Sequence, residues 1–344
     1  MENNYLIWID WVKFICIFFV YWCHVAIFSS DSNIPSFTFY DPFFVNGFFF
    51  ISGYLIFRKQ FSKNNRSLNF RDFWATNIKK NGMLPNMIFK IAIPSIIFSI
   101  LYYLPKTLIT NETISLSSFV FLCLLRGSFW FTGALITAEF IIFFLLLTRI
   151  KTIWFYLTIC GIIALIGNYL IFEKFTIYKD EFFPWFYKNG FVCSFFLTMG
   201  GGYHTIENRI KNKLLKWIII ATLTILYVVL TIILKVNVHC SCLSGVDIYG
   251  ILLSLLGIFT LINICKTLKE IKFIRYVSGH TIGLYFLSGN VPMICCFIVD
   301  KYFPNLMFSF YVCIFISFII AILIVYLLNR FLPFLFDLRV LKQK

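Results

Sequence analysis

Long apolar runs alternate with short polar connections along the whole of this chain. Each run holds about 18–22 residues, which is the length that an α-helix needs to cross the hydrocarbon core of a bilayer. We therefore predict an all-α, polytopic membrane protein with ten spanning helices. The predicted spans are residues 9–28, 40–57, 86–105, 129–148, 152–172, 185–203, 214–235, 246–265, 280–299 and 307–328.

Three local features modify this pattern. Residues 115–127 are apolar but too short to cross a bilayer, so we expect them to re-enter the membrane or to lie at its interface. The run Ser288-Gly289-Asn290 interrupts the ninth span, and the backbone groups freed by such a break can line a cavity. The glycines at 200–202 favour the close approach of another helix or a ligand.

The basic residues are unevenly divided between alternate connections. The connection 58–85 and the other even-numbered connections are rich in Lys and Arg, whereas 29–39 contains none. Because short cytoplasmic connections carry an excess of positive charge, this division places both termini and every even-numbered connection in the cytoplasm. The first run lacks a basic leader and a small-residue cleavage site, so we expect it to remain as the first spanning helix.

Composition supports a membrane protein. The chain of 344 residues is 60% hydrophobic and 13% charged, whereas soluble domains are about 45–50% apolar and about 25% charged. A net charge of +15 raises the possibility of nucleic acid. The charges lie in short connections, however, where they orient helices and meet lipid headgroups or an anionic ligand. We therefore expect membrane lipids, and no nucleic acid, as partners. We also expect residues 1–344 to form a single integral-membrane domain in the cell (cytoplasmic or inner) membrane.

The eleven cysteines do not predict a metal centre. Most lie singly inside apolar runs, where a thiol behaves as a small hydrophobic group. The one cluster in a connection, His239, Cys240 and Cys242, offers too few ligands at a suitable spacing. We expect no metal and no permanently bound cofactor.

His24 is the most unusual residue of the first span, because it lies deep in an apolar run. Ionisable residues inside spanning helices are costly and are functional candidates by default. A neutral imidazole can act as general base on a hydroxyl near neutral pH. The alternative is a histidine that hydrogen-bonds a neighbouring helix. Asp10 lies 14 residues earlier, about 21 Å away along a helix, and it can pair with Lys13.

Four further residues are candidates for binding. Lys79 and Lys80 lie just before the third span, where they can bind phosphates of a cytosolic cofactor or serve only as ordinary cytoplasmic charge. Arg126, on the outer side, can hold an anionic or glycan substrate or reach lipid headgroups. Glu139 lies mid-span and needs a basic partner or a proton. A fifth residue, Trp130, is typical of an interfacial aromatic belt.

Several of these residues resemble a known family, the membrane acyltransferase 3 family. The similarity covers the whole chain and is strongest in the second span and in the pair of Asp10 and His24. The matching segments are Ile9–Lys13 followed by His24, the string FFFISGYLI at Phe48–Ile56, Lys79-Lys80 with Leu84-Pro85, Phe129–Phe131, and Thr281–Tyr285.

The resemblance implies an O-acyltransferase. Its expected reaction moves an acyl group, by family default acetyl from acetyl-CoA, onto a hydroxyl of a cell-surface polysaccharide or lipid-linked glycan. It implies catalytic roles for His24 and Asp10. We assign the donor, acyl-CoA, to Lys79, Lys80, Arg58 and Ser52, and the glycan acceptor to Arg126, Trp130 and Glu139.

The chain departs from the family pattern at several positions. Where relatives carry a pair of arginines, Lys79 stands at the first position and Gly82 at the second. Lysine cannot supply the planar fork with which arginine binds phosphate. Ser128 and Ser288 stand where relatives often have histidine, and Glu139 does not align with the usual family glutamate.

Two other functions fit the same pattern of helices. Ten helices with buried polar groups also suit a transporter or exporter of glycan or lipid-linked glycan that transfers no acyl group. A structural partner of a glycan-assembly complex is a third possibility. The acyltransferase hypothesis makes one further structural prediction, which is that a polar passage leads from the 58–85 connection to His24.

Overall fold

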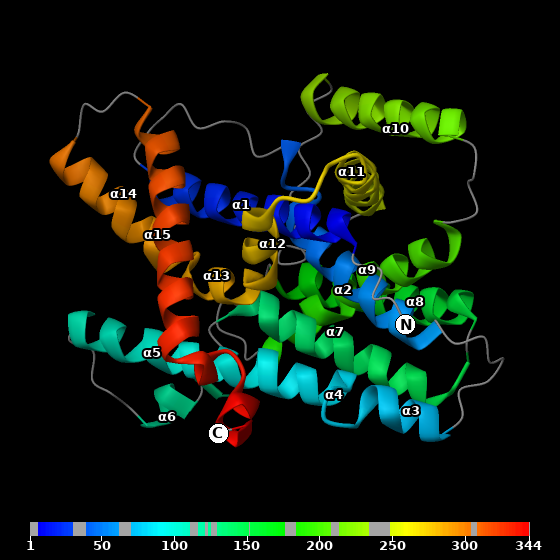
Figure 1. The fold of residues 1–344 in the computed structure, drawn as a ribbon, viewed down its shortest axis with the longest axis horizontal. Coiled ribbons are helices and arrows are strands. Elements are labelled where there is room, and N and C mark those ends of the chain that lie inside the picture. The colour runs from blue at the N-terminus through cyan, green and yellow to red at the C-terminus, as the bar shows by residue number, and fades with distance from the viewer. Residues whose placement is uncertain are drawn as a thin grey trace. The chain divides into compact units, whose positions relative to one another are not determined.

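A computed structural model describes residues 6–29, 39–61, 70–110, 116–120, 123–124, 129–150, 152–175, 184–207, 213–233, 248–303 and 308–343. All regular structure within these residues is helical, which confirms the all-α prediction (Figure 1). The α-helices are α1 (Ile7–Phe28), α2 (Phe44–Phe61), α3 (Phe70–Asn77), α4 (Met83–Asn86), α5 (Ile93–Thr110), α6 (Leu116–Phe119), α7 (Trp130–Leu147), α8 (Ile153–Phe175), α9 (Tyr187–Ile206), α10 (Lys213–Val228), α11 (Ile248–Cys265), α12 (Lys272–Gly279), α13 (Thr281–Leu287), α14 (Asn290–Tyr302) and α15 (Ser309–Phe331).

Short π and 3₁₀ segments extend or connect these helices. The π-helical segments are η2 (Met87–Ala92), between α4 and α5, and η5 (Val229–Ile233), after α10. The 3₁₀ segments are η4 (Pro184–Phe186), η6 (Pro333–Leu335) and η7 (Leu338–Gln343).

The chain divides into two compact units. The described residues of the first unit lie within Met1–Phe48, Lys211–Ser241 and Ile248–Leu332, and those of the second within Phe49–Ile210 and Pro333–Lys344. Helix α2 begins in the first unit and ends in the second. The prediction of a single membrane domain is not tested by this division and stays a prediction.

The spans are confirmed in part. Every predicted span contains a helix. Among the described residues, five helical segments are long and apolar enough to cross a membrane, namely Ile7–Phe28, Met83–Tyr103, Trp130–Leu147, Ile153–Ile171 and Ser309–Phe331. The bent pair α13 and α14 makes a sixth if it counts as one span, and the apolar helices Trp217–Thr231 and Tyr249–Cys265 are shorter. The structure therefore supports a multi-pass membrane protein, while the count of ten and the cytoplasmic termini stay predictions.

Of the three local predictions, the break in the ninth span is confirmed and the membrane position of 115–127 is not tested. The close approach at the glycines 200–202 is described below with the second unit. Helix α13 ends at Leu287, α14 begins at Asn290, and the two helices are bent by 47°, so the ninth span is broken where Ser288-Gly289-Asn290 predicted a break. Within 115–127 the structure places α6, which is too short to cross a bilayer, whereas residues 115, 121–122 and 125–127 lie outside the described part of the chain. The membrane position of this region stays a prediction.

In the first unit, α1 packs against α12 to α15. The side chains of Val25 and Ala26 share a buried apolar cluster with residues of α14 and α15. The hydroxyl of Tyr21 donates a hydrogen bond to the carbonyl oxygen of Leu284 at 2.8 Å, and this buried bond ties α1 to α13. Near the start of α1, the indole of Trp11 donates to the carbonyl oxygen of Lys269 at 2.9 Å. These contacts hold α1 along its length.

In the second unit, α2 and α9 cross through glycines. A Cβ atom added at Gly53 would lie 1.8 Å from the carbonyl oxygen of Leu197, and one added at Gly200 would lie 1.9 Å from the carbonyl oxygen of Phe50. No real side chain fits at such distances, so the two backbones touch directly at this crossing. The predicted close approach at the glycines 200–202 is therefore confirmed, and its partner is a helix.

Candidate functional site

His24 lies near the carboxyl end of α1, in the first unit. Its imidazole is partly buried and stacks on the ring of Phe28, with 6.4 Å between ring centroids and 14° between ring planes. No described residue hydrogen-bonds the imidazole, and residues 30–38, which follow this helix, are outside the described part of the chain. The predicted alternative, a histidine that bonds a neighbouring helix, has no partner among the described residues.

Asp10 lies on the first turn of the same helix and contacts another element. The hydroxyl of Ser278, on α12, donates a hydrogen bond to Asp10 Oδ1 at 2.6 Å. The carboxylate thus bonds α12, and it also attracts the ammonium of Lys13, the residue with which we predicted it could pair. The unbroken helix Ile7–Phe28 keeps Asp10 and His24 about 21 Å apart along its axis. The geometry gives Asp10 a role in anchoring α1, and it does not bring the carboxylate to the imidazole.

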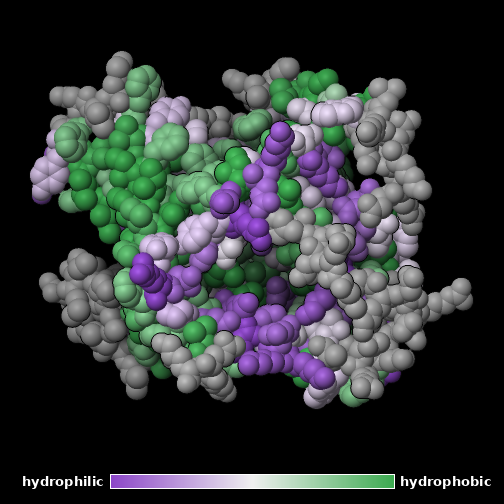
Figure 2. All heavy atoms as spheres, in the orientation of Figure 1, coloured by the Kyte–Doolittle hydropathy of each residue, from purple (hydrophilic) through white to green (hydrophobic). Residues whose placement is uncertain are grey.

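The predicted donor-binding lysines lie in the second unit, in the turn between α3 and α4. The side chains of Lys79 and Lys80 are exposed, and no described residue hydrogen-bonds either ammonium group. The turn closes through a hydrogen bond from the amide of Gly82 to the carbonyl oxygen of Lys79, at 2.5 Å. A Cβ atom at Gly82 would lie 2.5 Å from the backbone of Asn77, so this position requires glycine. In Figure 2 hydrophilic residues gather over α4 and this turn.

The carboxyl end of α2 is tied to the same turn. The ammonium of Lys59 donates a hydrogen bond to the carbonyl oxygen of Asn81 at 3.0 Å. Arg58 precedes Lys59, so the structure brings the helix end that carries this predicted residue to the turn with Lys79 and Lys80. Ser52 lies six residues before Arg58 on α2, about 9 Å farther along the axis, and the structure does not bring it to the turn.

The predicted acceptor residues are spread along α7, also in the second unit. Trp130 is the first residue of α7, is partly buried, and packs edge-on against Phe131 with 6.3 Å between centroids. Glu139 is buried nine residues later, about 13.5 Å along the helix axis. The two side chains therefore do not form one site. Arg126 lies outside the described residues.

A polar cluster between α2 and α9 escaped the sequence analysis as a unit. The hydroxyl of Tyr54 donates to Glu207 Oε1, and His204 Nδ1 lies 3.7 Å from the same oxygen. The rings of Tyr54 and His204 meet edge to face with 5.1 Å between centroids. Tyr54 belongs to the string FFFISGYLI, and His204 follows the glycines 200–202, where the sequence favoured an interfacial position for it. Neither pattern indicated the pairing, because the pairing depends on the crossing of two helices far apart in sequence.

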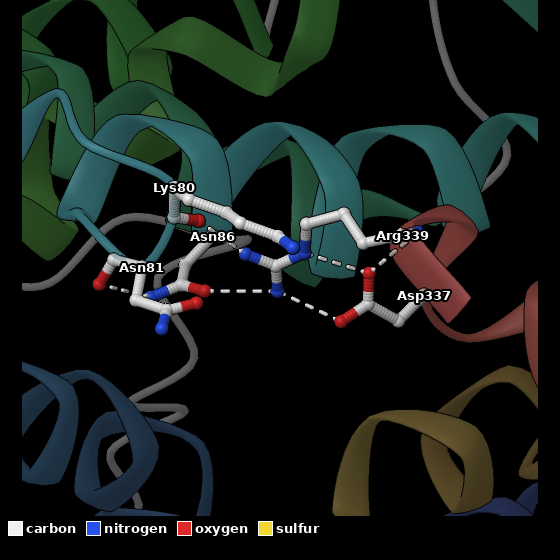
Figure 3. Close-up of polar contacts among 5 residues, drawn as sticks. All are labelled: Lys80, Asn81, Asn86, Asp337 and Arg339. Carbon is white, nitrogen blue, oxygen red and sulfur yellow. Dashed lines mark hydrogen bonds and ion pairs between the residues drawn. The ribbon is translucent and has the colours of Figure 1, made fainter. Parts of the chain in front are cut away.

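Arg339 was also missed. The sequence marks it only as one of the basic residues of the tail, yet its guanidinium contacts the turn that carries the predicted donor lysines (Figure 3). Nη1 donates to the carbonyl oxygen of Lys80 at 2.8 Å, and Nη2 donates to Asn86 Oδ1 at 3.0 Å. No local pattern could reveal a contact between residues 259 positions apart.

Comparison with known families identifies the chain. Residues 6–328 match the family model Acyl_transf_3, described as an acyltransferase domain. The chain belongs to this family. The match covers nearly the whole sequence and includes α1 with Asp10 and His24, the turn with Lys79 and Lys80, and α7. No curated protein and no solved structure matches the chain.

Membership confirms the resemblance found in the sequence and makes the protein an acyltransferase. The matched residues end before η6 and η7, so the segment with Arg339 lies beyond the region that the family model describes.

Proposed function

We propose that this acyltransferase is an integral-membrane O-acyltransferase of the cell membrane, which moves acetyl from acetyl-CoA onto a hydroxyl of a cell-surface polysaccharide or lipid-linked glycan. The observation that carries the donor assignment is the exposed turn between α3 and α4, with two lysine ammonium groups presented side by side in sequence. The family match supplies the reaction class.

Lys79 and Lys80 bind the phosphates of the donor in this proposal. Both groups lie at the surface, in a turn whose backbone is fixed by hydrogen bonds at Asn81 and Gly82. A lysine ammonium is a compact point charge that binds phosphate without the bidentate geometry of arginine. Two such groups compensate in charge for the arginine pair that this chain lacks.

His24 acts as the general base. Its imidazole takes the proton of the acceptor hydroxyl, and the oxygen forms a bond to the acyl carbon of the thioester. The carbon–sulfur bond breaks, and the departing thiolate of CoA receives the proton from the imidazolium. The sum is one ester and one free CoA thiol for each thioester and hydroxyl consumed. The reaction requires the thioester end of an extended donor to reach His24.

Acceptor binding is assigned to the α7 side of the chain. Trp130 offers an aromatic face for a sugar ring, and Arg126 offers a cation for an acidic sugar or a lipid phosphate. Glu139 is buried in the middle of α7 and serves as a proton carrier or as the partner of a cation on the acceptor side.

The test is acyl transfer by the purified full chain in lipid nanodiscs. We expect label from acetyl-CoA to enter a glycan or lipid-linked glycan fraction, with release of an equal amount of CoA thiol. Movement of unmodified glycan across the membrane of proteoliposomes, without any requirement for acyl-CoA and without thiol release, would instead support the transporter considered from the sequence.

A further inference from the structure

The segment after α15 returns to the turn with the two lysines. Its 3₁₀ segments η6 and η7 belong to the second unit, together with that turn. Phe336, between them, packs on Phe98 of α5 with 5.7 Å between ring centroids, and Leu335 is buried. The Cζ atom of Arg339 lies 5.8 Å from the centroid of Phe89. We call Pro333–Gln343 the C-terminal strap.

Arg339 is the polar centre of this strap (Figure 3). Its Nε and Nη2 donate to the two carboxylate oxygens of Asp337, at 2.8 Å and 2.7 Å. Its Nη1 donates to the carbonyl oxygen of Lys80, and its Nη2 also donates to Asn86 Oδ1. A guanidinium carries five N–H groups, so these four hydrogen bonds leave a single N–H on Nη1.

The contacts immobilise both sides of the turn. Asn86, which accepts from Arg339, donates through Nδ2 to the carbonyl oxygen of Asn81 at 3.3 Å. Lys59 donates to the same carbonyl oxygen. The adjacent carbonyl groups of residues 80 and 81 therefore receive donors from three side chains that belong to three separate elements. A turn held in this way fixes the backbone from which the Lys79 and Lys80 side chains project.

Asp337 makes this arrangement compatible with a cationic site. In Figure 3 the side chain of Lys80 extends in the direction of the Arg339 guanidinium. Two adjacent cations repel each other unless an anion lies beside them. The bidentate pair with Asp337 supplies that anion, and the hydrogen bond from Arg339 lowers the pKa of the Asp337 carboxyl below its ordinary value of 3.8. The carboxylate is therefore charged at neutral pH and offsets the charge of the Arg339 guanidinium, so Arg339 adds no net positive charge beside Lys79 and Lys80.

We propose that Arg339 is a positioning residue for the acyl-CoA donor, acting through the turn of Lys79 and Lys80 rather than on the phosphates directly. This inference rests on the proposed function, because it needs that turn to bind donor phosphates. It also extends that function, since the C-terminal strap lies outside the residues that match the acyltransferase family. In this proposal Arg339, although distant in sequence, holds rigid the turn with Lys79 and Lys80, which lacks the arginine pair.

The test compares two donors with the purified full chain. Acetyl-CoA carries phosphates, whereas S-acetylpantetheine carries the same thioester without them. We expect Arg339→Ala to raise the KM for acetyl-CoA about tenfold, a change of about 1.4 kcal/mol in binding free energy. We expect kcat to stay within about twofold and the kinetics with S-acetylpantetheine to stay unchanged. Arg339→Lys, which keeps the charge but loses the fork, should behave like Arg339→Ala.

Two controls keep this test decisive. Arg330→Ala removes an exposed arginine outside the C-terminal strap, which bonds Tyr326 of its own helix, and should leave the kinetics with both donors unaffected. Asn86→Ala removes one contact of the strap and should raise the KM for acetyl-CoA in the same direction, even if Arg339→Ala fails to fold. In a background of Lys79→Ala and Lys80→Ala, Arg339→Ala should have no further effect on KM, because its influence passes through those lysines.

Three outcomes are distinguishable. No acetyl transfer by the wild-type chain from either donor would contradict the proposed function itself. Transfer by the wild type with equal losses for both donors in Arg339→Ala would show a merely structural strap. An unchanged KM for acetyl-CoA in both Arg339→Ala and Asn86→Ala would overturn the positioning role while leaving the acyltransferase intact.

Discussion

His24 could be recognised as a functional candidate from its position in the sequence alone. An imidazole inside an apolar helix is costly, and that cost could be recognised without a structure. The structure adds that the ring is partly buried, stacks on Phe28 and has no hydrogen-bond partner among the described residues. Asp10 differs, because its bond to Ser278 joins residues 268 positions apart. No spacing rule predicts such a contact.

The first prediction concerns His24. His24→Ala should lower the rate of CoA thiol release in the presence of acceptor by about 10²–10⁴-fold, the usual contribution of a general base. The variant should retain its helix content by circular dichroism and its elution volume in detergent, because only a partly buried ring is removed. The assay is thiol release by purified protein in nanodiscs.

His280→Ala is the matched control for that experiment. In the same unit, His280 Nδ1 lies 2.8 Å from the carbonyl oxygen of Tyr276 and its Nε2 lies 3.1 Å from Asn329 Nδ2, so this ring serves as a local hydrogen-bonding group. We expect it to keep at least half of the wild-type rate. Equal rates for His24→Ala and the wild type would exclude His24 as the base.

At the scale of elements, the crossing of α2 and α9 shows what sequence could and could not provide. The glycines at 200–202 predicted close packing, and the string with Gly53 contributed to the family resemblance. Only the structure shows that each glycine faces the backbone of the other helix. Gly53 of α2 lies against Leu197 of α9, and Gly200 of α9 lies against Phe50 of α2. The pairing of two helices is a long-range property, and periodicity within one helix does not encode its partner.

The second prediction uses a pair of neighbouring glycines. A Cβ atom at Gly200 would lie 1.9 Å from a backbone oxygen, whereas one at Gly202 would meet Leu157 Cδ1 at an ordinary 3.7 Å. Gly200→Ala should therefore destabilise the protein by about 1–3 kcal/mol through overpacking. Gly202→Ala should be neutral or slightly stabilising, because alanine favours helix by about 1 kcal/mol over glycine.

The measurement is thermal unfolding in detergent, followed by tryptophan fluorescence for the wild type and both variants. The expected order of midpoints puts Gly200→Ala clearly below the other two. A midpoint for Gly200→Ala that equals that of Gly202→Ala would show that α2 and α9 do not cross as described.

At the scale of the whole molecule, the family could be predicted from the sequence, whereas the predicted number of ten spans is supported only in part. The motif residues are spread from α1 to α13, so even weak individual matches combine into one family assignment. Span counting depends instead on length and apolarity, which five or six segments satisfy in the part of the chain that the structure describes. Helices that pack on other helices, such as α2 and α9 at their glycine crossing, need not be apolar on every face, because some faces contact protein rather than lipid. Hydropathy alone therefore cannot decide whether they cross the membrane.

The central claim is that this protein acylates a surface glycan in a reaction that depends on His24. The most direct measurement is mass spectrometry of the surface glycan from cells that lack the gene and from the same cells complemented with wild type or with His24→Ala. We predict that the deletion removes the mass of one acyl group from each modified sugar, that wild type restores it, and that His24→Ala does not. An identical glycan mass in all three strains, or full restoration by His24→Ala, would contradict the account.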